Sequence, residues 1–478
     1  MRKRNRTTRQ KPQKCNMNSL TQVIAAVSTP PGKGGVAIIR MSGDGAFEIA
    51  DRVFKPISKR PFSLCEPRKQ IYGHVYDGEE KIDDVLATRF PAPHSYTGED
   101  TVEIGCHGGI LVTRTVLEAL LRAGAVMATA GEFTKRAFIN GRLSLTEAEA
   151  ISDLLEAKSR EQIRLSSDTA RARLAGRISG IRTSLVSLMS SIYARIDYPD
   201  EDLGDFTDGE VLSLLYNIKE DCESLISTYR TGRAVSEGMR TVICGKPNVG
   251  KSSLYNLLLG EDAAIVTDTE GTTRDVLERT APLGKVMLKI ADTAGIREND
   301  SADKIERIGI EKSRKMIEKS ELLFAIFDLS RPFDKLDEGI IQEISKSESP
   351  KIAVLNKCDL EKKFDESALK DSFDYVISIC ANDESAIEKL ASPVEKLFTD
   401  EKIKIGEDAV ISSARQHASL TRCLDFVNAA IESLSQGFSQ DAASTDIERA
   451  LGAVSELDGR AVSEEIVSDI FSKFCVGK

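Results

Sequence analysis

The sequence predicts a multidomain protein in which an α/β domain is inserted into a helical domain and preceded by an α+β domain. Three observations predict this fold class. Strand-like and helical runs alternate over residues 237–400, which is typical of a parallel α/β sheet. Residues 138–236 and 401–478 carry apolar side chains at helical spacing, and residues 19–137 mix both patterns. A chain of 478 residues has room for about three domains of ~150 residues each.

Composition narrows the class of protein. Hydrophobic content of 41% and charged content of 29% are ordinary for a globular chain, and no run approaches the roughly 18 apolar residues of a membrane span. A net charge of −10 argues against broad, non-specific nucleic-acid binding. The nine cysteines form no CxxC pair, which disfavours a zinc site and a disulfide framework and favours the reducing cytosol. Residues 1–18 are a basic tail that we predict to be disordered and dispensable.

The elements of the first domain follow from alternation and turn signals. Strands are expected at 23–27, 36–40, 70–76, 84–90 and 101–106, with helices at 46–54 and 113–123. The loops 97–100 and 107–109 lie beside strand ends, so they are either functional loops or only turns.

The helical regions repeat apolar residues at i, i+3 and i+4. One run extends from Leu145 to Ile192 and ends at an acidic loop with Pro199, which is a candidate cation site or simply a solvated turn. Further helices are expected at 211–229, 409–433, 446–457 and 463–474.

Residues 241–259 form the stretch with the clearest chemistry. An apolar strand (241–244) leads into GxxxxGKS (245–252), and helical spacing follows. Strand, glycine-rich loop and helix in this order are the context of a phosphate-binding P-loop. Its backbone N–H groups form an anion site, Lys251 reaches the β/γ-phosphates and the Ser252 hydroxyl holds Mg²⁺. The residues expected to bind nucleotide here are Asn248, Val249, Gly250, Lys251, Ser252 and Ser253.

Three further motifs follow in order, and predicted strands at 286–290, 322–328 and 351–355 separate them. A further strand at 374–379 follows the last motif. GTTRD (271–275) offers a Thr for the Mg²⁺ shell, and DTAG (292–295) offers an Asp near Mg²⁺ and a Gly N–H for the γ-phosphate. NKCD (356–359) places a carboxylate that accepts from guanine N1–H and its amine, so the set predicts a GTPase. The candidates are Thr273, Asp292, Thr293, Ala294, Gly295, Asn356, Lys357 and Asp359. A fifth contact to the base is assigned to Ala381 rather than to Ala414.

The residue after DTAG is Ile296, where many GTPases carry a Gln that orients the attacking water. An acidic side chain must then orient the water, and the candidates are Glu298, Asp300, Asp303, Glu306 and Glu311. A monovalent cation held by Asn248 and by loop carbonyls around 267–272 would supply charge, unless Asn248 only braces the loop. Cys475, near the chain end and close to cations, is a candidate functional thiol.

From about residue 23 to the end, the chain resembles the MnmE (TrmE) family of tRNA-modification GTPases, within the TrmE-Era-EngA-like GTPases. The matching stretches are PPGKGG (30–35), YTGED (96–100), GEFTKRAF (131–138), AEA (148–150), the acidic loop 197–202, the GTPase motifs, ERIGI (306–310) and FCVGK (474–478). The resemblance implies a folate-binding and dimerisation domain (19–137), a helical domain in two parts (138–236 and 401–478) and a G domain (237–400).

The resemblance also implies an activity. With an FAD-dependent MnmG-type partner, a cytoplasmic homodimer would form the 5-carboxymethylaminomethyl or aminomethyl group on wobble uridine (U34) of certain tRNAs. Methylene-tetrahydrofolate would supply the one-carbon unit. GTP hydrolysis would need Mg²⁺ and would be stimulated by K⁺ when two G domains meet.

Site residues implied by the resemblance complete the set. Glu306 would orient the water, with Lys251 stabilising charge. K⁺ would be held by Asn248, Thr267, Thr269 and Thr272, with Thr267 also in the GTP site, and Mg²⁺ by Ser252 and Thr273. Folate would contact Arg40, Glu99, Arg142 and Lys478, although Arg142 replaces the family's Lys. Two rival functions are a ribosome-assembly GTPase, whose usual KH-type module we do not find, and a folate-dependent transferase with a regulatory G domain.

Overall fold

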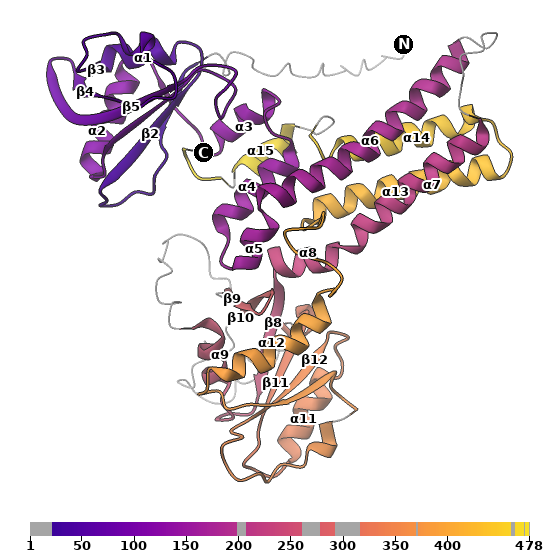
Figure 1. Ribbon diagram of the computed structural model, residues 1–478. Coiled ribbons are helices and arrows are strands. Elements are labelled where there is room, and N and C mark those ends of the chain that lie inside the picture. Colours follow the sequence, from indigo (N-terminus) through magenta and orange to yellow (C-terminus); the bar gives the residue numbers. More distant parts are fainter. Residues whose placement is uncertain are drawn as a thin grey trace, which may run out of the picture. The chain divides into compact units, whose positions relative to one another are not determined.

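The computed structural model describes residues 22–197, 207–260, 278–291, 316–369, 371–459, 464–472 and 474–477. The chain divides into two compact units (Figure 1). One unit holds the described parts of 1–152 and 462–478, and the other holds those of 153–461. The predicted limits of three domains remain a prediction, because the two units group the chain differently.

A seven-stranded sheet forms the centre of the first unit, in the order β3-β4-β5-β6-β2-β1-β7. All neighbours are antiparallel except β1 and β7. The strands are β1 Ile24–Val27, β2 Val36–Ser42, β3 Phe54–Pro56, β4 Ile71–Asp77, β5 Glu80–Phe90, β6 Thr101–His107 and β7 Val126–Met127. The helices are α1 Ala46–Val53, the short 3-10 helix η2 Phe62–Leu64, α2 Ile110–Arg122 and α3 Glu132–Ile139.

Buried and more exposed side chains alternate along β2, so one face of the sheet is covered by the core. Ala37, Ile39 and Met41 are buried and point to the same face, since side chains alternate along a strand. They pack with Val116 and Leu120 of α2 in one apolar core. The predicted strands of this unit are therefore confirmed, and the predicted helix 46–54 is wrong only at Phe54, which begins β3.

The chain's last residues belong to the first unit. Phe471 of helix α15 (Glu464–Ser472) and Phe474 just after it are buried with Leu145 and Ala148 of helix α4 (Leu145–Glu156). Val476 then forms a bridge to Ala130. Apolar burial by the Phe pair accounts for this docking, whereas spacing alone had grouped the tail with the second helical part.

The second unit contains a bundle of four long helices that share one apolar core (Figure 1). They are α6 Asp168–Asp197, α7 Asp208–Ser227, α13 Ala414–Ser435 and α14 Gln440–Ser455. Leu185, Leu215, Val427 and Ile447, one from each helix, are fully buried in a shared core. Two flanks of the chain thus build one helical core, as the apolar spacing predicts. The shorter helices are α5 Arg160–Leu165 and α8 Tyr229–Ser236.

A six-stranded sheet forms the rest of this unit, in the order β13-β12-β11-β8-β10-β9. The strands are β8 Met239–Gly245, β9 Glu278–Leu283, β10 Val286–Ala291, β11 Leu322–Asp328, β12 Lys351–Asn356 and β13 Tyr375–Ser378. All pairs are parallel except β9 with β10. The helices are α9 Lys251–Leu259, α11 Lys335–Ile344, α12 Ser385–Phe398 and the short 3-10 helix η4 Glu366–Leu369.

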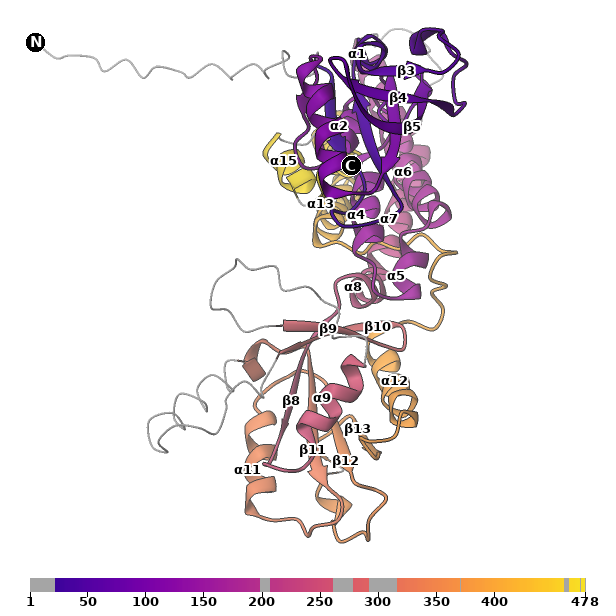
Figure 2. The same cartoon turned by 90° about the vertical axis from the view of Figure 1, so that its left-hand side faces the viewer.

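Helices cover both faces of this sheet, which explains its nearly continuous apolar strands. Phe324 and Ile326 of β11 point toward Leu254 of α9 and Leu390 of α12, whereas Leu323 and Phe327 share the opposite face with Ile344 of α11. Figure 2 shows α11 on one side of the sheet and α9 with α12 on the other. The predicted fold class is confirmed.

Several elements differ from the prediction. The short strands β3 and β7 were not expected, and the helices predicted at 409–433 and 446–457 are α13 Ala414–Ser435 and α14 Gln440–Ser455. The antiparallel edge strand β9 was missed, because its six residues include Arg279 and Pro282 and show no clean apolar run. The single helix expected at 211–229 is two helices. Helix α7 ends at Ser227, and α8 begins at Tyr229. Thr228 lies between them, and its hydroxyl accepts from the backbone N–H of Ile411 at 3.1 Å.

Candidate nucleotide site

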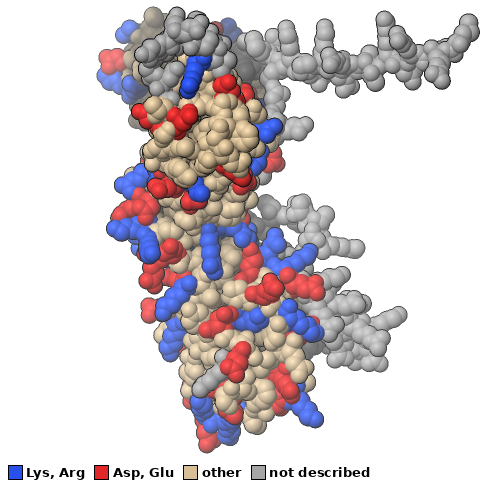
Figure 3. All heavy atoms as spheres, turned by 90° about the vertical axis from the view of Figure 1, so that its right-hand side faces the viewer, with Lys and Arg blue, Asp and Glu red and all other residues tan. Residues whose placement is uncertain are grey.

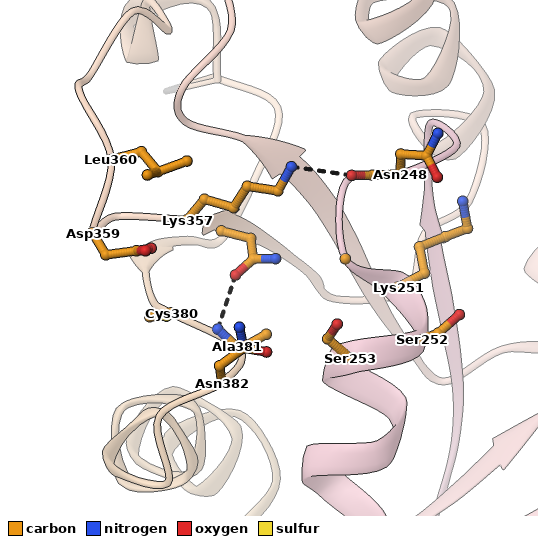
Figure 4. Close-up of a pocket in the computed structure, with 12 residues that line it drawn as sticks. Asn248, Lys251, Ser252, Ser253, Lys357, Asp359, Leu360, Cys380, Ala381 and Asn382 are labelled. Atoms are coloured by element: carbon orange, nitrogen blue, oxygen red, sulfur yellow. Dashed lines mark hydrogen bonds between the residues drawn. The ribbon is translucent and has the colours of Figure 1, made fainter.

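A cavity of about 520 Å³ opens where three loops meet, after β8, β12 and β13 (Figure 4). The carboxyl ends of parallel strands lie at one edge of a sheet, and ligands of open α/β sheets bind there. Its lining residues are Asn248, Gly250, Lys251, Ser252, Ser253, Asn356, Lys357, Asp359, Leu360, Cys380, Ala381 and Asn382. The structure therefore brings together candidates that the sequence separates by more than 100 positions.

The P-loop has the backbone of an anion-binding turn. Gly250 caps the N-terminus of α9 with φ 106°, and Asn248 also has a positive φ of 64°. A Cβ on Gly250 would lie 2.0 Å from Nδ2 of Asn356, so only glycine fits. The first turn of α9 directs backbone N–H groups and the positive end of the helix dipole at the cavity.

Lys251 is the ammonium closest to this turn in the sequence. Its Nζ donates to the carbonyls of Gly245 and Lys246 at 2.9 and 2.7 Å. Ser252 and Ser253 follow on the same helical turn and line the cavity. An ammonium, two hydroxyls and a helix N-terminus are the groups that a polyphosphate requires.

Asn356 joins the three loops. Its Nδ2 donates to the carbonyl of Val249 at 2.8 Å, and its Oδ1 accepts from the N–H of Ala381 at 2.9 Å. The side chain is buried, with 4% of the residue exposed. Because both ends of this amide are hydrogen-bonded, the P-loop and the predicted base-binding loop are held at a fixed separation.

Lys357, in the loop after β12, contacts both the end of β11 and the P-loop. Its Nζ lies 2.6 Å from Oδ2 of Asp328 and donates to the carbonyl of Asn248 at 3.2 Å (Figure 4). Burial opposes ionisation of Asp328, but hydrogen bonds from Lys357 and Ser330 outweigh it and lower the pKa of this carboxyl. Sequence reasoning missed Asp328, whose only signal was its place at the end of a buried strand.

The far end of the cavity holds the predicted base contacts. Asp359 and Ala381 both line it, and Figure 4 shows Asp359 across the cavity from Ser253. Ala414, the other candidate for the fifth motif, is the first residue of α13 in the helical bundle. The described geometry therefore favours Ala381, although its role stays a prediction.

Several predicted site residues lie outside the described part of the chain. They are Thr267, Thr269, Thr272, Thr273, Asp292, Thr293, Ala294, Gly295, Glu306 and Lys478, together with the other four candidate acids and the acidic loop from 198 on. Of the predicted metal ligands, the structure describes Ser252 for Mg²⁺ and Asn248 for K⁺. Both line the cavity at the phosphate end, and oxygen donors there suit hard cations.

Of the predicted folate residues, Arg40, Glu99 and Arg142 are described, and they lie in the first unit around the loop before β6. Arg40 pairs with Glu103 through Nη2 at 2.8 Å, and its guanidinium lies 5.4 Å from the centre of the Tyr96 ring. Glu99 accepts from the Ser42 hydroxyl at 2.8 Å. A Cβ on Gly98 would lie 3.2 Å from Cγ of Arg142, so Arg142 borders the same loop.

Arg136 is the residue of this region that sequence reasoning missed. Its side chain is fully buried and pairs with Glu99 at 3.2 Å and Glu132 at 3.0 Å. We call Ser42, Glu99, Glu132 and Arg136 the Glu99 cluster. A buried guanidinium with two carboxylates holds Glu99 in place. The signal was present in GEFTKRAF (131–138), where Arg136 follows Glu132 by one helical turn.

The C-terminal tail docks beside β1. The Ser28 hydroxyl donates to the carbonyl of Gly477 at 2.9 Å, and the N–H of Gly131 donates to the carbonyl of Cys475 at 3.4 Å. Gly477 has φ 102°, and a Cβ there would lie 2.3 Å from the carbonyl oxygen of Val27. Cys475 is exposed, so its thiol is accessible.

The surface drawn in Figure 3 carries acidic and basic side chains interspersed. Among the residues described on that face, no broad area of one sign gathers, in keeping with a net charge of −10 for the whole chain. Within the described ranges, no helix is both long enough and apolar enough to cross a membrane.

Family models match the chain over nearly its whole length. A model described as "GTP-binding protein TrmE N-terminus" matches residues 23–142. A second, described as "MnmE helical domain", matches residues 145–475.

Curated relatives agree with these matches. A protein named tRNA modification GTPase MnmE from Thermotoga sp. (strain RQ2) is 40% identical over 458 residues, which cover 95% of this chain and 99% of the relative. A protein of the same name from Thermoanaerobacter sp. (strain X514) is 38% identical, over 95% of this chain and 99% of the relative. Another, from Clostridioides difficile (strain 630), is 36% identical over 96% of this chain and the full length of the relative.

Proposed function

The chain belongs to the MnmE family of tRNA modification GTPases, and on that premise we propose that it binds and hydrolyses GTP in the cavity between the P-loop and the loop after β12. One observation carries this proposal. The Asn356 amide ties Val249 to Ala381, so phosphate-binding and base-binding groups face one cavity of nucleotide size.

Different residues of the cavity bind the base, the phosphates and the cations. Asp359 accepts from guanine N1–H and the exocyclic amine, a donor pair that adenine lacks. Backbone N–H groups of 248–252 surround the phosphates, and Lys251 leaves its carbonyl partners for the β/γ-phosphate oxygens. Ser252 would hold Mg²⁺, and Asn248 would contribute to K⁺ binding. When bound, these cations supply positive charge beside the phosphates.

Hydrolysis follows from positioning and charge stabilisation. Glu306 orients the attacking water and accepts a proton from it. It takes the role of the Gln that many GTPases carry at the position of Ile296. Thr273 would complete the Mg²⁺ shell with Asp292 near the ion, and the N–H of Gly295 would donate to the γ-phosphate. Two G domains would meet across a homodimer, and in that state Asn248, Thr267, Thr269 and Thr272 would hold K⁺.

The modification reaction itself extends the proposal. With an FAD-dependent MnmG-type partner, the homodimer forms the 5-carboxymethylaminomethyl or aminomethyl group on wobble uridine in the cytoplasm. Arg40, Glu99, Arg142 and Lys478 contact a methylene-tetrahydrofolate that donates one carbon. The limits 19–137, 138–236, 237–400 and 401–478 define the domains in this scheme. The crowding of Arg40, Glu99 and Arg142 around one loop supports the folate assignment.

The rate of GTP hydrolysis in potassium against sodium salts tests the cation. At equal ionic strength, we expect turnover in KCl to exceed that in NaCl by at least about tenfold. The proposed site selects K⁺ over the smaller Na⁺, and a cation held beside the phosphates lowers the barrier. Equal rates would contradict K⁺ stimulation.

Replacing the proposed water-positioning acid tests the mechanism. Glu306→Ala should lower turnover by about 100-fold while GTP binding persists, the usual size of a lost general base. Glu298→Ala, in the same stretch, is the matched control and should retain turnover. Near-normal turnover in Glu306→Ala would make the assignment wrong.

A further inference from the structure

Two lysines beside the nucleotide cavity contact carboxylates from one short segment that no nucleotide motif includes. Nζ of Lys246, the second residue of the P-loop motif, lies 2.7 Å from Oδ2 of Asp337 and 2.9 Å from Oδ2 of Asp334. Nζ of Lys357 lies 2.6 Å from Oδ2 of Asp328. We call these five residues the carboxylate clasp.

Three members of the clasp are withdrawn from water, whereas the side chains of Asp334 and Lys357 are 52% and 30% exposed. Asp328 and Asp337 are 3% and 1% exposed, and the Lys246 side chain is 13% exposed. Ion pairs in such surroundings are screened little by salt, and losing one partner leaves a buried charge. Burial disfavours the charged form of Lys246, but hydrogen bonds to Asp337 and Asp334 outweigh it and raise its pKa.

Secondary structure fixes the carboxylates. Asp328 ends β11, and its Oδ1 accepts from the N–H and hydroxyl of Ser330 at 3.0 and 2.6 Å. Asp334 caps the N-terminus of α11, and Asp337 completes the capping box by accepting from the N–H of Asp334. The acids therefore belong to a strand end and a helix start that are anchored in the sheet core.

The lysines of the clasp hold the P-loop on both sides of Pro247. The carbonyl of Lys246 accepts from Nζ of Lys251 at 2.7 Å, and the carbonyl of Asn248 accepts from Nζ of Lys357 at 3.2 Å. Fixing the Lys246 side chain thus fixes a peptide that contacts the phosphate-binding lysine.

We propose that Asp328, Asp334 and Asp337 position the P-loop through Lys246 and Lys357 and thereby set how tightly the protein holds its nucleotide. The inference rests on the proposed nucleotide site. A preformed loop need not be ordered when the ligand binds, so the clasp slows nucleotide release. The carboxylates also neutralise two ammoniums near the phosphates, which leaves Lys251 as the lysine that changes partner. These acids are positioning residues, because none of them lines the cavity.

Nucleotide release from the full-length protein tests the clasp, with N-methylanthraniloyl-GDP as the fluorescent probe in stopped flow. Lys246→Met should speed release by about tenfold, equivalent to roughly 1.4 kcal/mol, and raise KM for GTP in parallel. The kcat at saturating GTP should change by less than about twofold, because the lost contact acts on binding. Lys246→Arg keeps the charge and should restore slow release.

A matched ion pair provides the control. Nζ of Lys346 lies 2.7 Å from Oε2 of Glu343, near the opposite end of α11, and its side chain is 66% exposed. Lys346→Met should leave release unchanged. If Lys246→Met is too unstable to measure, Lys246→Met combined with Asp337→Leu removes both buried charges and should show the same fast release.

The outcomes separate the clasp from the proposed function. Release at the wild-type rate in Lys246→Met or in the double variant would overturn the clasp, and so would a loss of kcat without a change in KM. Failure of the wild-type protein to bind the probe would instead overturn the proposed nucleotide site.

Discussion

The nucleotide cavity and the Glu99 cluster both gather charged side chains, but the chain builds them from different groups. The cavity uses loop backbone, one buried amide and carboxyl ends of parallel strands, all within short motifs. The Glu99 cluster uses side chains from three separate elements that already satisfy one another, with Arg136 fully buried between Glu99 and Glu132.

This difference has a consequence for ligand binding. A site made of backbone N–H groups is ready for an anion, whereas a site made of paired side chains must exchange partners when a ligand enters. Changes in the cavity should therefore affect ligand affinity with little effect on folding, and changes in the Glu99 cluster should do the reverse. Two variants test that contrast, and two further ones test charged pairs that lie beside these regions.

The largest effect is expected in the Glu99 cluster. Arg136→Met removes a fully buried guanidinium and leaves Glu99 and Glu132 without it, which should cost about 3 kcal/mol of unfolding free energy. Chemical denaturation followed by circular dichroism measures the loss, and GTP affinity should stay within about twofold of wild type. Arg114→Met, on an exposed helical pair with Glu118, is the control and should be nearly silent. If Arg136→Met unfolded with the same free energy as wild type, the Glu99 cluster would not stabilise the fold.

The second-largest effect is expected in the nucleotide cavity, on GTP affinity rather than on stability. Gly250→Ala would place a Cβ 2.0 Å from Nδ2 of Asn356 at φ 106°, so the loop must move. GTP affinity should fall by at least about 100-fold, roughly 2.7 kcal/mol, in isothermal titration calorimetry. Gly339→Ala, where nothing lies within 4 Å of the added Cβ, should bind normally. Unchanged affinity in Gly250→Ala would contradict the site.

A smaller effect is expected at Arg40. Its pair with Glu103 is partly exposed, at 17% and 30% of the two side chains, so Arg40→Met should cost about 1 kcal/mol of stability. If Arg40 also contacts folate, binding of a reduced folate should weaken more than folding does. Equal folate affinity in Arg40→Met and wild type would remove Arg40 from the folate site.

The smallest effect concerns acid stability. The pKa of Asp328 is lowered in the folded protein, so its contribution is present above the ordinary value of 3.8 and is lost as pH falls through the lower folded value. The stability difference between wild type and Asp328→Asn should therefore shrink below about pH 4. Denaturation curves between pH 3 and 7 measure it, and a constant difference would contradict the ion pair with Lys357.

The same contrast explains what the sequence could predict. Motifs such as NKCD (356–359) place several functional groups within a few residues, so local spacing identified Asn356, Lys357 and Asp359 together. The contact of Lys246 with Asp337 spans 91 positions, and that of Arg136 with Glu99 spans 37. Charged residues so far apart in the sequence form no local motif that would identify them as partners. The strand β9 was missed for a related reason, because an edge strand has little apolar periodicity.

Analysis of wobble-uridine nucleosides in cellular tRNA tests the central claim most directly. The tRNA of a strain that carries this chain should contain the 5-substituted wobble uridine, which should be absent after deletion or after Gly250→Ala and present with Gly339→Ala. The dependence on Gly250 would link the modification to the nucleotide cavity. An unaltered wobble nucleoside in the deletion strain would contradict the account.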